Sequence, residues 1–281
     1  MRLESGGSSD YVEDRRGRRM GGPMMGGGLG LGGLILVLLF SWLTGTDPTS
    51  ILSLVSNGSG VEDADTPGVT GSPITDQAGR FATDVLNDLQ PTWARILGAR
   101  YRPTTLVLFT DATQSGCGFA QAATGPFYCP SDQKVYIDLA FFDELHRRFG
   151  APGDFAQAYV LAHEVGHHVQ NLLGIERQMR HAQQADPRQA NELSVRLELQ
   201  ADCFAGVWGH STQERQLLDP GDVEEGLAAA AAIGDDRLQR QAGQRVSPES
   251  FTHGTSAQRT QWLRRGLEEG TVEACDTFAA R

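Results

Sequence analysis

A histidine-rich stretch, residues 159–170, constrains the fold of this chain more than any other. It reads YVLAHEVGHHVQ and holds His163, Glu164 and His167 in a His-Glu-x-x-His pattern. On a helix, residues four apart project from one face about one turn apart, so the two imidazoles can share one metal ion. Glu164, between them, can take a proton from a water at that ion, which is the chemistry of zinc hydrolases. The pattern therefore predicts a helix that binds zinc.

A motif with three fixed identities also recurs by chance, usually on a solvated helix. Apolar residues surround this one: Phe155, Ala158, Tyr159, Val160, Leu161, Ala162, Val169, Leu172 and Leu173. They predict a largely buried helix, and a buried helix rarely carries His and Glu without using them. Asp154 with Gln157 resembles a capping box at its start, and Gly174 is typical of a helix end.

Composition and charge limit the class of protein. A chain of 281 residues with 40% hydrophobic content suffices for one sizeable domain and an appendage. The net charge of −11 argues against a nucleic-acid binder, which needs a basic face. The four cysteines are too few for a disulfide scaffold and lack the close pairs of a structural zinc site.

The first quarter of the chain is organised differently from the rest. Residues 1–28 are polar and then glycine-rich, and we expect a cytoplasmic segment without a core. Residues 29–43 are almost wholly apolar and, with the preceding glycines, reach the roughly 20 residues that span a bilayer. A cleaved signal peptide and a buried soluble helix are the alternatives, but the long acidic leader and the lack of a cleavage site after Leu43 favour a transmembrane anchor. Residues 44–75 predict a flexible linker, and residues 76–281 a folded domain.

The basic residues near the apolar segment all precede it, because none occurs between Arg19 and Arg80. This asymmetry predicts a cytoplasmic N-terminus and an extracytoplasmic domain on a single-pass cell-membrane protein. In that oxidising setting Cys117 can pair with Cys129 across a short loop, and Cys203 with Cys275. Four cysteines allow three connectivities, and the sequence alone leaves all three open.

Periodicity predicts several further elements. Apolar residues recur at helical spacing from 81 to 96, and Gly98 ends the pattern. Residues 106–109 and 135–138 are short apolar runs of strand type. A strand beside the metal helix could bind an extended substrate as an additional strand, whereas an ordinary sheet edge is the alternative. Residues 227–233 form an alanine-rich segment suited to close helix packing.

A catalytic zinc site needs three protein ligands and a water, and Glu198 is the candidate for the third ligand. Glu198 and Asp202 share one face of a helical segment whose other residues are mostly apolar. Two acids there would repel each other unless a cation or a hydrogen-bond donor lay between them. We predict that Glu198 binds zinc and that Asp202 accepts a hydrogen bond from a ligand histidine. A surface glutamate paired with Arg196 is the alternative.

The combined motifs resemble known metallopeptidases. His163-Glu164-x-x-His167 followed by Glu198-x-x-x-Asp202 is similar to the gluzincin arrangement and to membrane-bound CAAX-processing metalloproteases. More specifically, the chain resembles the neutral zinc metallopeptidase family of bacterial single-anchor membrane proteins. The segments that carry this resemblance are residues 12–17, 117–119, 125–130, the site helix, 198–202 and 250–254. It implies a zinc peptidase with His163, His167 and Glu198 as ligands, Glu164 as general base and Asp202 behind the ligands.

His253 is a further candidate for the site. It follows a proline-containing loop and precedes an amphipathic helix with Trp262, a context similar to a late His-Pro segment of the CAAX-processing enzymes. Here Gly254 replaces that proline, which weakens the correspondence. We predict that His253 donates a hydrogen bond to the oxyanion of the tetrahedral intermediate. An ordinary loop histidine at a helix start is the alternative.

Together these features predict an α+β fold, a mostly helical zincin-like domain with a small sheet preceded by one transmembrane helix. The predicted function is a membrane-anchored, Zn²⁺-dependent endopeptidase that hydrolyses extracytoplasmic or membrane-proximal proteins. The alternative is a catalytically silent zincin-fold module that binds a membrane or envelope partner. Retention of Glu164 favours the enzyme, because a binding role needs no general base. The sequence does not define the natural substrate or the oligomeric state.

Overall fold

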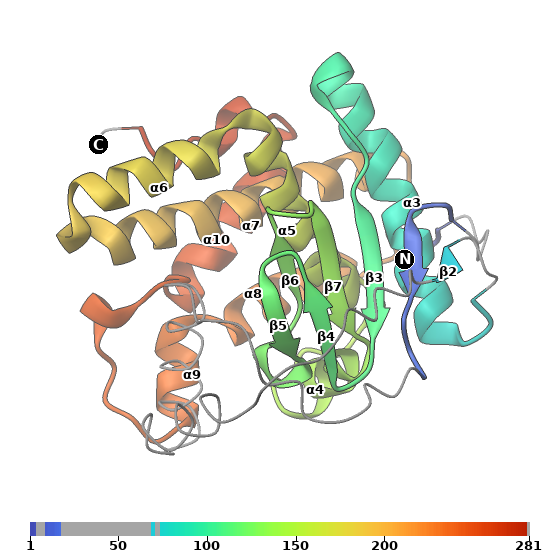
Figure 1. Ribbon diagram of the computed structural model, residues 1–281, viewed down its shortest axis with the longest axis horizontal. Helices are drawn as coiled ribbons and strands as arrows, with labels where there is room; N and C mark the ends of the chain where they lie inside the picture. The colour runs from blue at the N-terminus through green and yellow to red at the C-terminus, as the bar shows by residue number, and fades with distance from the viewer. Residues whose placement is uncertain (4–8, 18–68, 71–73, 280–281) are drawn as a thin grey trace, which may run out of the picture.

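The computed structural model describes residues 1–3, 9–17, 69–70 and 74–279, and it is an α+β fold with a small sheet, as predicted (Figure 1). Its helices are α3 (Gln77–Leu97), α4 (Ala140–Arg147), α5 (Asp154–Leu173), α6 (Ile175–Ala185), α7 (Ala190–Glu214), α8 (Asp222–Ala232), α9 (Asp235–Gln241) and α10 (Ser256–Glu269). Its strands are β1 (Val12–Asp14), β2 (Val69–Thr70), β3 (Thr105–Phe109), β4 (Ala112–Ser115), β5 (Gly118–Gln121), β6 (Phe127–Cys129) and β7 (Lys134–Asp138).

The main sheet has the strand order β2-β1-β3-β7-β6. Its central strands β1, β3 and β7 are parallel, and the edge strands β2 and β6 are antiparallel to their neighbours. Alternate side chains of a strand point to opposite faces. Leu106 and Leu108 of β3 accordingly join the main core, whereas Val107 and Phe109 join a smaller cluster on the other face. Strands β4 and β5 form a separate hairpin.

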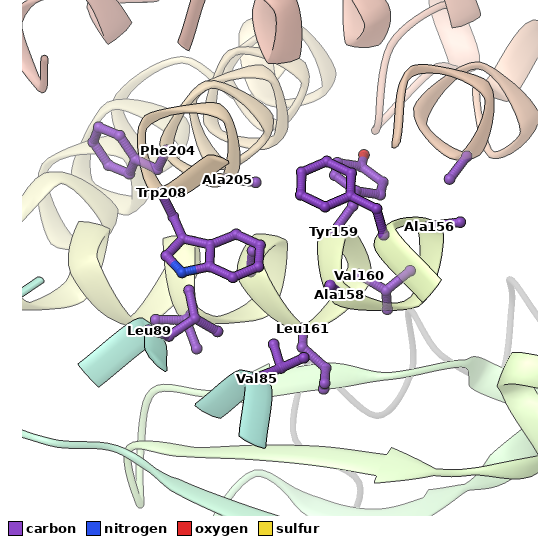
Figure 2. Close-up of a cluster of buried hydrophobic side chains, with 14 of the residues drawn as sticks. Val85, Leu89, Ala156, Ala158, Tyr159, Val160, Leu161, Phe204, Ala205 and Trp208 are labelled. Atoms are coloured by element: carbon purple, nitrogen blue, oxygen red, sulfur yellow. The ribbon is translucent and has the colours of Figure 1, made fainter. Parts of the chain in front are cut away.

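The helix that carries the histidine motif, α5, runs behind the sheet, and α6, α7 and α10 extend to one side (Figure 1). Figure 2 shows Val85 and Leu89 of α3, Leu161 of α5 and Trp208 of α7 in the layer between these helices, and each is at most 2% exposed. The ring of Trp208 stacks on Phe155 at a centroid distance of 5.9 Å. The motif helix is therefore buried, as its apolar flanks predict.

The ends of α5 differ partly from expectation. The predicted capping box is absent, because Asp154 accepts a hydrogen bond from the α-amino group of Met1 instead. The start of the helix is capped by Glu225 of α8, whose Oε2 lies 3.2 Å from the backbone nitrogen of Phe155. Gly153 has a φ of 117°, and a Cβ there would overlap the Glu225 carboxylate. At the other end Gly174 adopts the left-handed conformation that was predicted.

The N-terminal residues belong to the folded domain. Val12 of β1 is 3% exposed, and β1 lies between β3 and β2 in the sheet. Strand β1 is hydrogen-bonded to β2 and to β3. The described part of the predicted segment 1–28 therefore contributes a strand to the sheet of the predicted domain, residues 76–281.

The transmembrane helix of the predicted fold is not supported. Among the residues that the structure describes, no helix is both long enough and apolar enough to cross a bilayer. The predicted anchor, residues 29–43, lies outside the described residues, as does most of the predicted linker, residues 44–75. Over the residues that the structure describes, the fold class is therefore corrected to an α+β domain with a small sheet and no preceding transmembrane helix.

Candidate metal centre

Two helices supply the candidate ligands. His163 and His167 come from α5, and Glu198 comes from α7. The two helices approach closely at Gly166, inside the histidine motif, where a Cβ would lie only 3.0 Å from the backbone oxygen of Ala201. The small residue at this position thus lets α7 come near enough for Glu198 to reach both histidines.

The three side chains converge on one point. The Nε2 atoms of His163 and His167 are 3.2 Å apart. Glu198 places Oε2 at 3.1 Å from Nε2 of His163 and Oε1 at 3.5 Å from Nε2 of His167. The edge between two ligand atoms of a tetrahedral zinc site with bonds of about 2.05 Å is about 3.3 Å. The donor set and its spacing therefore fit zinc.

The hydrogen bonds behind the rings determine which nitrogens face this point. Nδ1 of His163 lies 2.8 Å from Oδ1 of Asp202, and Nδ1 of His167 lies 2.9 Å from Oε1 of Gln170. Both partners are acceptors, so each Nδ1 carries a hydrogen, and in the neutral ring the lone pair lies on Nε2. In that state two lone pairs and a carboxylate face one another, an arrangement that a cation between them stabilises.

The support behind His163 is charged. Arg259 of α10 donates two hydrogen bonds of 2.9 Å to the carboxylate of Asp202. Tyr159 donates a third, of 2.5 Å, to the same carboxylate and accepts one from Arg259. Asp202 is 0% and Arg259 2% exposed. A buried carboxylate is costly unless it is paired and hydrogen-bonded, and here both conditions are met.

These neighbours also shift the pKa values of the site. Burial favours the neutral ring of His163, but the charge of Asp202 and the hydrogen bonds to Asp202 and Glu198 outweigh it and raise the pKa of His163 to about 10. Burial opposes ionisation of Asp202, yet Arg259 above all, then His163, lower its pKa. Burial likewise opposes ionisation of Glu198, and the neighbouring histidines hold its pKa well below the usual range. The site thus attracts a proton or a metal ion.

Helix α10 brings Arg259 to the site by packing directly on α7. A Cβ on Gly206 of α7 would overlap the backbone of Leu263, and one on Gly266 of α10 would overlap the backbone of Cys203. The two glycines therefore permit backbone contact between the helices. Arg259 lies in the first turn of α10, whose start is fixed by a capping box of Thr255 with Gln258.

Glu164 has the burial expected of a catalytic acid–base residue. It lies on α5 between the two histidines and is only 9% exposed. Within the described part of the chain its carboxylate has no hydrogen-bond partner. A nearly buried acid without a protein partner remains free to bind a water or a substrate group.

His253 is held next to the site by Asp235, the first residue of α9. Oδ2 of Asp235 accepts hydrogen bonds from the backbone amides of Thr252, His253 and Gly254 at 2.8, 2.7 and 3.0 Å. Its Oδ1 lies 3.2 Å from Nδ1 of His253, which leaves Nε2 directed away from Asp235. Burial lowers the pKa of His253, but Asp235 and the charge of Glu198 raise it overall. The ring, 45% exposed, can thus meet a substrate.

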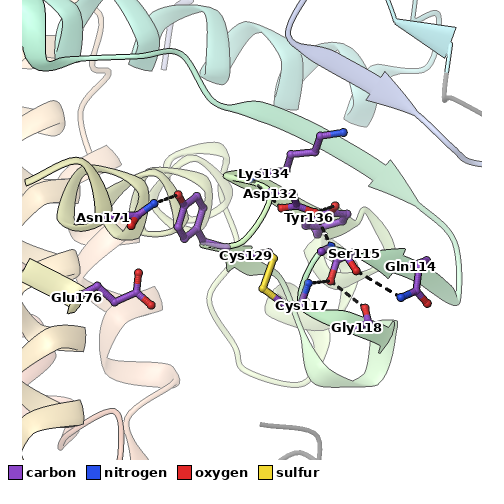
Figure 3. Close-up of a disulfide and its surroundings, with 12 residues drawn as sticks. Gln114, Ser115, Cys117, Gly118, Cys129, Asp132, Lys134, Tyr136, Asn171 and Glu176 are labelled. Atoms are coloured by element: carbon purple, nitrogen blue, oxygen red, sulfur yellow. Dashed lines mark hydrogen bonds between the residues drawn. A yellow bond between two sulfur atoms is a disulfide. The ribbon is translucent and has the colours of Figure 1, made fainter. Parts of the chain in front are cut away.

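All four cysteines form disulfides, in the pairing that the sequence analysis put forward. Cys117 joins Cys129, and Cys203 joins Cys275, with Cα–Cα distances of 5.8 and 5.5 Å. The first bridge ties the β4–β5 hairpin to the edge strand β6 (Figure 3). The neighbouring Tyr128 of β6 accepts a hydrogen bond from Asn171 of α5. The edge strand β6 is thus attached to α5, the helix that carries the histidine motif.

Several site residues were not singled out from the sequence. Arg259 and Asp235 lie on α10 and α9, far along the chain from the histidine motif, so no local pattern connects them to it. A sequence pattern could have identified Gln170 as a site residue. It is a polar residue three positions after His167 on a buried helix, and that spacing places the two side chains on one face.

Comparison with known proteins agrees with these observations. Residues 1–278 match the family described as "Putative neutral zinc metallopeptidase". The chain is 49% identical over 289 residues to the uncharacterized protein YpfJ of Escherichia coli K12, with 99% of each chain covered. It is 45% identical over 205 residues to the uncharacterized protein Rv2575 of Mycobacterium tuberculosis H37Rv, covering 69% of this chain and 68% of the relative. No solved structure matches.

Proposed function

Because the chain belongs to the neutral zinc metallopeptidase family, we propose that it is a zinc-dependent endopeptidase. The observation that carries the proposal is the convergence of the Nε2 atoms of the two histidines and the Glu198 carboxylate at 3.1 to 3.5 Å. His163, His167 and Glu198 would hold the metal, and a fourth position would stay open for water and substrate. Three protein ligands are typical of catalytic zinc, whereas structural sites use four.

A bound zinc ion would supply a Lewis acid that polarises the peptide carbonyl and activates water. Glu164 would take the proton of the attacking water and deliver it to the leaving nitrogen. Asp202 and Gln170 would hold the ligand rings in the required tautomer. His253, oriented by Asp235, would donate a hydrogen bond to the oxygen that gains negative charge in the transition state.

The substrate would be an extended peptide in an oxidising compartment outside the cytoplasm. Two disulfides in a chain of this size support that compartment, because cytosolic proteins seldom keep them. The position of strand β6 favours an extended peptide as substrate. This strand forms the edge of the sheet beside α5, and an extended chain can add to a sheet edge as a further strand.

The test compares wild-type protein with the Glu164→Gln variant on a generic unfolded protein. We expect about one zinc per chain in both, with cleavage reduced by about 10² to 10⁴ in the variant and abolished in the wild type by a chelator. His253→Ala should lower turnover with the zinc content unchanged. Cleavage that survives Glu164→Gln or chelation would refute the proposed function.

A catalytically silent binding module with the same fold is the second candidate. It would explain the metal site but not the free carboxylate of Glu164, which binding does not require. Zinc binding without cleavage of any tested peptide would favour it.

A further inference from the structure

The support behind His167 is a row of neutral amides that leads away from the site. The amide nitrogen of Gln170 donates to Oε1 of Gln200, on α7, at 3.1 Å and to the backbone oxygen of Leu197 at 2.7 Å. The amide nitrogen of Gln200 in turn donates to the backbone oxygen of Cys275 at 2.9 Å. Three hydrogen bonds thus connect His167 to a residue near the C-terminus.

Backbone carbonyls set the direction of both amides, because a carbonyl can only accept. The carbonyl of Cys275 turns the amide nitrogen of Gln200 towards itself and the oxygen of Gln200 towards Gln170. Gln170 then directs its amide nitrogen towards that oxygen and towards the carbonyl of Leu197, and its own oxygen towards Nδ1 of His167. A reversed amide of Gln170 would donate to Nδ1 instead, place the ring hydrogen on Nε2 and remove a metal ligand.

The row is shielded from water and is closed by a disulfide. Gln170 and Cys275 are 0% exposed and Gln200 is 5% exposed. Cys275 is bonded to Cys203, which lies three residues after Gln200 on α7. The bridge therefore holds the accepting carbonyl beside the residue that donates to it. Solvent has no access to replace a hydrogen bond of this row, and each loss leaves a buried polar group unsatisfied.

We propose that Gln170 and Gln200 are positioning residues for the metal site, and that the Cys203–Cys275 disulfide maintains their orientation. This amide relay, from His167 through Gln170 and Gln200 to the carbonyl of Cys275, makes metal affinity depend on an intact disulfide. The inference rests on the proposed zinc function, because it concerns the tautomer of a zinc ligand.

The first test measures zinc affinity of the full-length protein by competition with a chelator of known affinity. Gln170→Met should weaken zinc binding about 10- to 100-fold, and Gln200→Met should weaken it by a smaller factor. Gln183→Met is the matched control, because Gln183 also joins two helices through two hydrogen bonds but has no contact with the site. Its zinc affinity should equal that of the wild type. Unaltered affinity in Gln200→Met would overturn the relay.

A double variant separates positioning from general loosening. Because Gln200 acts through Gln170, the pair Gln170→Met/Gln200→Met should bind zinc as weakly as Gln170→Met alone. Additive losses would overturn the proposal. The visible spectrum of the cobalt-substituted protein is an independent readout, expected to change in both single variants and not in Gln183→Met. A wild type that binds no zinc would instead defeat the proposed function itself.

The disulfide has its own comparison. The variant Cys203→Ala/Cys275→Ala lacks the bridge and offers no thiols that could bind zinc. In the otherwise wild-type protein, this double substitution should weaken zinc binding. In the Gln170→Met protein, it should cause no further loss of zinc affinity. Cys117→Ala/Cys129→Ala removes the other bridge and should leave zinc affinity unchanged. Equal losses of zinc affinity on removal of either disulfide, or no loss on removal of Cys203–Cys275, would contradict the coupling between this disulfide and the metal site.

Discussion

The two histidines of the site lie one helical turn apart, yet the groups behind them differ in kind. Nδ1 of His163 meets the carboxylate of Asp202, which is paired with Arg259. Nδ1 of His167 meets the neutral amide of Gln170. Both supports accept the ring hydrogen, and both orient Nε2 towards the same point. One site is thus built from a charged and a neutral support.

The difference follows from what each side of α7 contacts. The side with Asp202 packs on α10, which supplies a cation, so a buried carboxylate is tolerated there. The side with Gln200 packs on the C-terminal residues around Cys275, which supply a backbone carbonyl. Amides satisfy that environment without a second buried cation. A ligand histidine thus needs a hydrogen-bond acceptor of fixed orientation behind it. Whether that acceptor is charged or neutral depends on the groups packed around it.

The largest effect is expected from removing the cation of the charged support. Arg259→Leu removes the main counter-charge and two hydrogen bonds of the buried Asp202 carboxylate, so the free energy of unfolding of the metal-free protein should fall by about 3 to 5 kcal/mol. Urea denaturation measures it. Arg264→Leu, an exposed arginine on the same helix, should change it by less than about 0.5 kcal/mol. Similar losses in both variants would show that the charged support does not depend on the ion pair.

A second variant makes the two supports alike. Asp202→Asn/Arg259→Met replaces the ion pair as a unit and leaves an amide oxygen behind His163. The free energy of unfolding should return to within about 2 kcal/mol of the wild type, because no unpaired charge stays buried. Zinc affinity should still fall about tenfold, because a carboxylate makes the ligand ring more basic than an amide does. Competition with a chelator measures it, and unchanged affinity would mean that the charge behind His163 has no effect.

Acid should act on the charged support and spare the amide relay. The pKa of Asp202 in the folded protein lies below its ordinary value of 3.8, in spite of burial, because of Arg259 and His163. Its stabilising contribution is therefore present above pH 3.8 and is lost as the pH falls through the folded pKa. The metal-free wild type should lose stability relative to Asp202→Asn/Arg259→Met over that range, while Gln170→Met should follow the wild type. Urea denaturation at several pH values between about 5 and 3 tests this.

The parts of the site that were predictable from the sequence are those set by the helical repeat. His163 with His167 and Glu198 with Asp202 are each four residues apart, so their shared faces follow from helix geometry alone. The helix over residues 81–96 appears as α3 for the same reason. The strands at 106–109 and 135–138 appear as β3 and β7, because short apolar runs favour buried strands. Local sequence patterns carry that information.

Some contacts between distant segments were not predictable. Arg259 meets Asp202 across 57 residues of sequence, through a glycine contact between two helices that no single segment reveals. Strand β1 has only three residues, too few for a periodic pattern, and its pairing with β3 depends on the tertiary fold. The capping box at Asp154 failed because Glu225, from another helix, occupies that helix end. In each case a tertiary partner decides the structure.

The smallest effect is expected at the start of α10. This helix carries Arg259 of the charged support and no residue of the amide relay. The hydroxyl of Thr255 accepts from the backbone nitrogen of Gln258 at 3.1 Å, and Oε1 of Gln258 accepts from the backbone nitrogen of Thr255 at 2.9 Å. Thr255→Ala should lower the free energy of unfolding by about 1 kcal/mol, and Thr255→Ser should restore most of it. Zinc affinity should stay nearly unchanged, because both hydrogen bonds from Arg259 to Asp202 persist. A loss in Thr255→Ala as large as that in Arg259→Leu would mean that the cap, and not the ion pair, holds α10 against α7.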